Sequence, residues 1–130
     1  MKRRIYYYDT DTSGAVYHGN YLRYLEEARS EYLEERGLTV KGLLEAGTGF
    51  AVRRQEMEYK FPAFYGDILD IKTSVKEFTA YRIVFAYTLY NQDAKLIGKA
   101  ETELVCVGRD LKLKEVPPEV KAALESGAAA

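Results

Sequence analysis

The sequence has one cysteine, one histidine, three prolines and no tryptophan among its 130 residues. A single cysteine excludes an internal disulfide, and one histidine with one cysteine cannot build a usual zinc site. No apolar run approaches the ~20 residues that span a bilayer. The start, MKRRIYYYD, has a basic head but too short an apolar stretch for a signal peptide. We therefore expect a cytoplasmic protein with no membrane span.

Neither sign of charge is in excess: 19 lysines and arginines stand against 20 aspartates and glutamates, a formal net charge of -1. This balance gives no electrostatic footprint for nucleic acid. Hydrophobic residues make up 47% of the chain, which is typical of one folded domain over residues 1–130. The twelve tyrosines suit half-exposed sheet faces and subunit interfaces, and they favour a homo-oligomer.

Periodic apolar residues divide the chain into one long helix and several strands. Tyr21, Leu25, Ala28 and Tyr32 recur at helical spacing, and Gly37 marks the end of that helix. The later segments alternate between apolar and polar residues, as strands do. The expected elements are a strand over residues 4–8, a long helix over 18–36, a short helix over 40–46, strands near 50–61, 68–78, 81–90 and 95–107, and a short terminal helix that frays from about residue 122.

Consecutive strands joined by short turns favour an antiparallel sheet. The only long helix must then cover one face of that sheet. The sequence thus predicts an α+β domain with about five strands, in which the second face of the sheet is shared between solvent and a partner.

The segment DTDTSGAVYHGN holds two aspartates, a glycine and the single histidine directly before the long helix. One interpretation is that its polar residues form turns and caps, and this is how we interpret Asp9. A second is a calcium loop, because Asp9, Asp11, Ser13 and Gly14 match the start of an EF-hand. Against it, Asn20 replaces the final glutamate of that motif, and a strand stands where the entering helix belongs.

A third interpretation is catalytic. The N-terminus of a helix presents unpaired amides that can polarise a carbonyl group. An aspartate with a pKa near ~3.9 is ionised at neutral pH and can act as a base or a nucleophile. A polarised carbonyl beside a carboxylate is the minimum needed to hydrolyse an activated acyl group.

The segment YYDTDTSGAVYHGNYLRYLEEAR resembles the signature of hotdog-fold acyl-CoA thioesterases in the 4-hydroxybenzoyl-CoA thioesterase-like family. It looks closest to the branch associated with the bacterial Tol–Pal envelope system. VRRQEMEYKFPAFYGDILDIKTSV, YRIVFAYTLYN, GKAETELVCV and LKEVPPEV resemble later parts of that branch in order and spacing, so the likeness extends to about Val120. It implies a long central helix wrapped by an antiparallel sheet, with two protomers paired edge to edge and two active sites at their interface.

The resemblance also implies roles for individual residues. Asp11 matches the family's catalytic aspartate, acting as general base or nucleophile, and the backbone amide at His18 polarises the thioester carbonyl. The candidate substrate-binding residues near the motif are Gly14, Tyr17, Asn20 and Tyr65. The candidates for the phosphates of coenzyme A lie in two basic regions and are Arg82, Arg109, Lys112 and Lys114.

The function that we predict is hydrolysis of acyl-CoA to a free acid and coenzyme A, without a metal or other cofactor, by a homodimer or homotetramer. The alternatives are a thioesterase acting on acyl carrier protein and a non-catalytic acyl-CoA-binding or scaffold protein. The intact Asp11 argues against a pure binder, which gains nothing from a carboxylate beside an anionic ligand. A Cys106 nucleophile paired with His18 is a further alternative, but LVCVG places this cysteine on an inward strand face, where cysteine behaves as a small hydrophobe.

Overall fold

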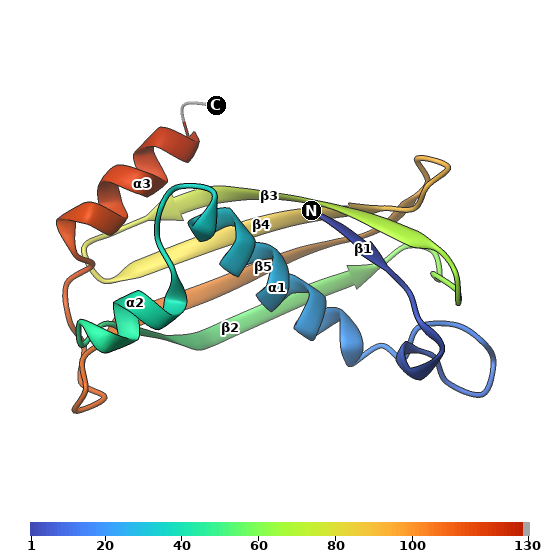
Figure 1. Ribbon diagram of the computed structural model, residues 1–130, viewed down its shortest axis with the longest axis horizontal. Helices are drawn as coiled ribbons and strands as arrows, with labels where there is room; N and C mark the ends of the chain where they lie inside the picture. Colours follow the sequence, from blue (N-terminus) through green and yellow to red (C-terminus); the bar gives the residue numbers. More distant parts are fainter. Residues whose placement is uncertain (129–130) are drawn as a thin grey trace.

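The computed structural model describes residues 1–128 and contains a five-stranded sheet crossed on one face by a long helix (Figure 1). The strand order is β1-β3-β4-β5-β2, and every neighbouring pair is antiparallel. The α+β class and the number of strands agree with the sequence prediction. The elements in chain order are β1 (Lys2–Arg4), the 3-10 helix η1 (Tyr7–Asp9), α1 (Asn20–Glu34), α2 (Val40–Glu45), β2 (Gly49–Tyr59), β3 (Ile68–Phe78), β4 (Arg82–Tyr90), β5 (Leu96–Val107) and α3 (Pro118–Ala128).

The helix α1 lies over the sheet because one side of it is apolar at helical spacing. The four residues of the predicted stripe, Tyr21, Leu25, Ala28 and Tyr32, are all buried. They meet inward residues of the strands, as in the edge-to-face contact between Tyr32 and Phe85 with ring centroids 5.6 Å apart. Burial of this stripe fixes which side of α1 faces the sheet.

Alternation along the central strands supplies the other half of the core. Ile83, Phe85, Tyr87 and Leu89 of β4 are each at most 2% exposed. The opposite face of the sheet is charged and carries cross-strand ion pairs, including one between Arg82 and Glu103. The two faces therefore differ as the sequence pattern predicts.

The first strand differs from its predicted range of residues 4–8. Pairing with β3 covers only Lys2–Arg4, and the chain then turns into η1. Ile5 is the last inward residue and is fully buried. Beyond it, the Asp9 carboxylate accepts a hydrogen bond from the Tyr6 amide at 2.8 Å, which closes a tight turn. This local bond outweighs the strand preference of the three tyrosines.

The helix α1 begins later and ends earlier than the predicted range of 18–36. Its first helical residue is Asn20, because His18 and Gly19 belong to the turn before it. At the other end Gly37 adopts a φ of 82°, and the Leu38 amide donates to the Leu33 carbonyl at 3.0 Å. This is the glycine-terminated ending that the sequence indicates.

The terminal helix is longer than expected. The sequence predicts fraying from about residue 122, whereas α3 extends to Ala128 and buries Leu124 completely. In Figure 1 α3 lies beside β3, which it contacts. Residues 129–130 of the predicted frayed tail lie outside the described residues.

The two edges of the sheet are unequal. At one edge β1 has three residues, whereas β2 at the other edge has eleven and, among the described residues, pairs with β5 alone. A long edge strand presents unpaired backbone groups that can pair with another chain. None of the helices in the described part of the chain is long and apolar enough to cross a membrane.

Candidate active site

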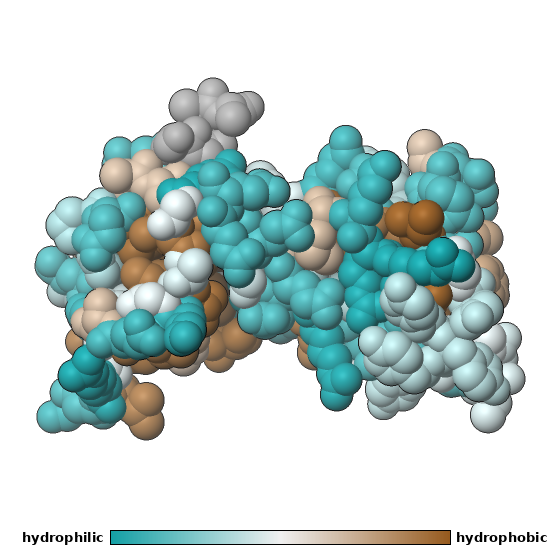
Figure 2. All heavy atoms as spheres, viewed as in Figure 1, coloured by the Kyte–Doolittle hydropathy of each residue, from teal (hydrophilic) through white to brown (hydrophobic). Residues whose placement is uncertain are grey.

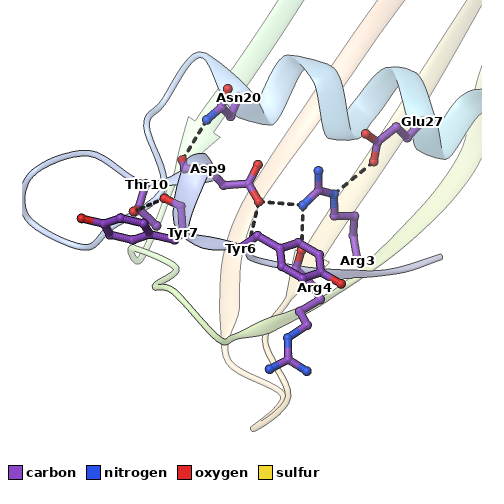
Figure 3. Close-up of polar contacts among 8 residues, drawn as sticks. All are labelled: Arg3, Arg4, Tyr6, Tyr7, Asp9, Thr10, Asn20 and Glu27. Carbon is purple, nitrogen blue, oxygen red and sulfur yellow. Dashed lines mark hydrogen bonds and ion pairs between the residues drawn. The ribbon is translucent and has the colours of Figure 1, made fainter.

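The buried carboxylate of Asp9 anchors the loop that follows η1 (Figure 3). Its side chain is 4% exposed, and its Oδ2 accepts hydrogen bonds from the Tyr6 amide and from Nη1 of Arg3, both at 2.8 Å. Burial is the largest single influence and raises the pKa of Asp9, but the two donors, the Tyr24 side chain and the charge of Arg3 together outweigh it, and the pKa is lowered. Asp9 therefore shapes the turn, as interpreted from the sequence, and its paired carboxylate is not available as the first ligand of a calcium loop.

Arg3 and Asp9 together tie three elements to one point. The Arg3 guanidinium on β1 also reaches Glu27 of α1, with Nε 3.3 Å from Oε1 (Figure 3). The backbone carbonyl of Asp9 accepts from Nδ2 of Asn20 at 2.8 Å and from the Tyr17 amide at 3.0 Å. The start of the loop and the start of α1 are thus held against each other.

Asp11 stands on this base with its side chain exposed to solvent. Its Oδ1 accepts from the Ser13 amide at 2.8 Å and from the Ser13 hydroxyl at 2.5 Å. The Ser13 hydroxyl is the largest cause of a lowered Asp11 pKa, followed by the Ser13 amide and the charge of His18. No donor in the described part of the chain reaches Oδ2. Asp11 is therefore ionised at neutral pH, with one oxygen free to react.

The turn before α1 supplies the polarising groups. The amides of His18 and Gly19 donate to no acceptor among residues 1–128, whereas the Asn20 amide already bonds the Tyr17 carbonyl. Two successive free amides at a helix entrance can bind a carbonyl oxygen. His18 is therefore placed near the helix start as predicted, although it is not itself the first helical residue.

The nearby substrate-binding candidates gather around this pair of features. Gly14 has a φ of 83°, which reverses the loop, and its carbonyl accepts from the Tyr65 amide at 3.1 Å. Tyr17 packs on the His18 ring with centroids 4.5 Å apart. Tyr17 and Tyr65 are both exposed. Asn20 holds the loop through its side chain and does not cap the helix; Gly19 occupies the cap position.

The basic candidates lie elsewhere in the chain. Arg109 donates to the Glu45 carbonyl at 2.7 Å, and Lys114 donates to the Thr48 hydroxyl at 2.6 Å, so both lie where β2 begins. Asp11 lies near the other end, where the Tyr59 hydroxyl bonds the His18 carbonyl at 3.2 Å. Ten residues of strand separate these ends, which is about 33 Å. The exposed Lys112 and the ion-paired Arg82 belong to the distant end as well.

The alternative of a cysteine nucleophile fails on position and environment. Cys106 is fully buried, and burial raises the pKa of its thiol. It is the register partner of Phe50, nine residues along β2 from Tyr59, the residue that contacts His18. A separation of about 30 Å excludes a cysteine–histidine pair within the chain.

Sequence reasoning missed two features of the site. It treated Ser13 as a turn residue or a position in a calcium loop, although the spacing Asp-x-Ser is typical of a local bond between hydroxyl and carboxylate. It also assigned the carbonyl-binding role to the His18 amide alone, whereas the Gly19 amide is equally free. Across residues 1–128 no group of three or more histidine, cysteine, aspartate or glutamate side chains is arranged to hold a metal ion.

An antiparallel sheet with a long helix across it, and a carboxylate loop at the entrance to that helix, define a hotdog-type thioesterase domain. The chain belongs to the thioesterase-like superfamily, whose family model matches residues 6–124. This confirms the family likeness and the hotdog fold predicted from the sequence.

Curated relatives and solved structures agree with this assignment. The chain is 40% identical over 124 residues to the acyl-CoA thioesterase YbgC of Haemophilus influenzae, covering 92% of this chain and 89% of the relative. It is 36% identical over 111 residues to the acyl-CoA thioester hydrolase YbgC of Escherichia coli, covering 85% and 82%. The crystal structure of a DHNA-CoA thioesterase from Staphylococcus aureus superposes with a TM-score of 0.90 at 28% identity, covering 99% of this chain and 89% of that one. The matches to YbgC proteins are consistent with the Tol–Pal-associated branch.

Proposed function

We propose that this protein hydrolyses acyl-CoA thioesters to a free acid and coenzyme A, with Asp11 as the reacting carboxylate. The single observation that carries the assignment of the site is an ionised, exposed Asp11 next to the free amides of His18 and Gly19. The acyl-CoA substrate is supported by the names of the thioesterases to which the chain is similar.

The two features divide the work of the reaction. The amides of His18 and Gly19 bind the thioester carbonyl oxygen and stabilise the negative charge that develops on it. Oδ2 of Asp11 either takes a proton from the attacking water or attacks the carbonyl carbon itself. In the first route the hydroxide adds to the carbonyl carbon, the carbon–sulfur bond breaks and coenzyme A leaves as the thiolate, which receives the proton held by Asp11 directly or through water. In the second route the attack forms a mixed anhydride as the carbon–sulfur bond breaks and the thiolate of coenzyme A leaves, and water then hydrolyses the anhydride to the free acid and regenerates Asp11.

We further propose that the working unit is a homodimer paired along β2, which is also the unit from which a homotetramer would be built. The eleven-residue edge of β2 supports this pairing. In an antiparallel pair related by a two-fold axis, the end of β2 at Tyr59 in one copy meets the end at Gly49 in the other. Asp11 of each copy then faces Arg109 and Lys114 of its partner. Within one chain, Asp11 and these two cations lie at opposite ends of β2 and do not meet.

Pairing along β2 also offers a place for the acyl group. An apolar cavity of about 230 Å³ opens between α1, α2 and the start of β2, and brown atoms mark this part of the surface in Figure 2. Leu33, Leu43 and Phe50 are among its lining residues. In the proposed dimer this cavity of one copy lies on the same side as Asp11 of the other, so a carboxylate, cations and an apolar cavity converge on one substrate.

The test is thiol release from short, long and aromatic acyl-CoAs, with the same acyl groups on acyl carrier protein assayed side by side. We expect the wild type to hydrolyse the CoA thioesters and Asp11→Asn to lose at least about a hundredfold in kcat. Asp93→Asn is the matched control, because Asp93 is an exposed aspartate in the turn between β4 and β5, outside the loop that holds Asp11. Turnover of carrier-protein thioesters alone would show that the substrate is acyl carrier protein and not acyl-CoA. Binding of coenzyme A without hydrolysis would identify a scaffold protein, and full activity in Asp11→Asn would refute the assignment of the base.

A further inference from the structure

Ser13 makes closer contact with Asp11 than any other residue does. Both its amide and its hydroxyl donate to the same carboxylate oxygen, Oδ1, and the hydroxyl contact is the shorter at 2.5 Å. A hydroxyl bonded to a carboxylate stabilises the ionised form and restricts rotation of the carboxyl group. The turn itself is closed by backbone bonds between Asp11 and Ala15 and between Gly14 and Asp11, to which the Ser13 hydroxyl adds only a long contact by accepting from the Ala15 amide at 3.4 Å.

The other charged groups around Asp11 are bonded to other residues or affect its pKa less than Ser13 does. Asp9, on the same loop, is buried and paired with Arg3. Asp67, in the turn that packs against Gly14, accepts from the Phe64 amide and from Gln92. His18, at the entrance to α1, lowers the pKa of Asp11 less than Ser13 does. Ser13 is thus the main local control on the protonation of this carboxylate.

We propose that Ser13 is a positioning residue for the reaction at Asp11, holding Oδ1 so that Oδ2 faces the substrate. The proposal rests on the proposed function, in which Asp11 is the reacting group. It assigns to Ser13 a role distinct from building the turn. The role depends on the hydroxyl, so threonine at this position retains it and alanine does not.

The consequence is a shift in the pH dependence of the reaction. Asp11 must be deprotonated to act, and the hydroxyl bond keeps its pKa below the ordinary value. In Ser13→Ala this bond is lost while the amide bond remains, so the Asp11 pKa rises and the acidic limb of kcat/KM moves to higher pH. The ratio of wild-type to variant kcat/KM should therefore be smallest on the plateau and should grow as the pH falls.

The experiment measures kcat/KM for an acyl-CoA from acidic to neutral pH in the wild type, Ser13→Ala, Ser13→Thr and Thr12→Ala. Thr12 is the matched control, an exposed neighbouring hydroxyl that bonds to none of residues 1–128. We expect the limb to move in Ser13→Ala only, and Ser13→Thr to restore it. Thermal unfolding of each variant confirms that the fold is unchanged under the assay conditions.

A second measurement follows the Asp11 carboxyl carbon by NMR, assigned by its absence from the spectrum of Asp11→Asn. We expect this carbon to titrate at higher pH in Ser13→Ala than in the wild type. The role of Ser13 would be overturned if the Asp11 carbon titrated at the same pH in the wild type and in Ser13→Ala, or if the acidic limbs of these two proteins coincided. If Asp11→Asn is inactive in the same experiment, the proposed function stays intact. Wild-type activity in Asp11→Asn would instead overturn the proposed function.

Discussion

Arg3→Met is the substitution that tests whether a buried ion pair holds the candidate site together. The variant keeps most of the apolar stem of the side chain and removes the only cation bonded to the Asp9 carboxylate among the described residues. Asp9 is 4% exposed, so its charge would stay in the interior, near the Tyr24 hydroxyl and with the Tyr6 amide as its remaining backbone donor. An unpaired buried charge is strongly unfavourable.

The expected loss follows from the burial of the two partners. Breaking a buried pair by removing one partner typically costs about 3–5 kcal/mol. The Arg3 side chain is 16% exposed and lies at the rim of the interior, which places the loss near the lower end, about 3 kcal/mol. For a chain of this length that corresponds to a melting temperature lower by roughly 10 °C.

The loss of stability in Arg3→Met should depend on pH in a direction that other causes of instability do not share. In the wild type the lowered pKa of Asp9 gives stability that is present above the unfolded pKa, near ~3.9, and is lost as the pH falls through the folded pKa. In Arg3→Met the largest lowering side chain is gone and burial raises the pKa of Asp9. The gap in stability between wild type and variant should therefore be greatest at neutral pH and should shrink in acid.

Urea unfolding followed by circular dichroism measures these differences across the pH range. Arg4→Met is the matched control, since Arg4 is exposed and makes no bond to Asp9. Asp9→Asn in the Arg3→Met background removes the orphaned charge and should recover much of the loss. A loss below about 1 kcal/mol, equal losses in the Arg3 and Arg4 variants, or no recovery in the double variant would refute the reasoning.

Three further substitutions test other parts of the structure. Leu25→Ala removes a fully buried side chain of α1 and should cost about 2–5 kcal/mol in urea unfolding, whereas Leu22→Ala, at a half-exposed position, should cost less than about 1. Gly37→Ala places a side chain at a φ of 82° and should cost about 1 kcal/mol; an unchanged midpoint would contradict this. Lys112→Gln should raise KM for acyl-CoA several-fold but leave hydrolysis of an acyl-pantetheine unchanged, and equal effects on both substrates would exclude contact with the nucleotide.

The helices and strands with periodic apolar residues could be predicted from the sequence, because the spacing of apolar residues directly reflects which side of an element is buried. The stripe from Tyr21 to Tyr32 and the alternation in β4 each report which side of an element faces the core. The same reasoning failed at Tyr6, Tyr7 and Tyr8, where strand propensity was misleading. A single side-chain bond from Asp9 to the chain three residues earlier decided the turn there, and no periodic signal announces such a bond.

The sequence by itself determined the reactive residue types and their order along one short loop, since Asp11, Ser13 and His18 are close in the chain and must lie close in space. Only the tertiary structure decided the rest. It buried Asp9 with Arg3 and left Asp11 free, although the two aspartates are neighbours in an alternating motif. It also separated Asp11 from Arg109 by the length of β2, because residues on opposite ends of an antiparallel strand are kept apart by its rigid backbone, whatever their chemistry.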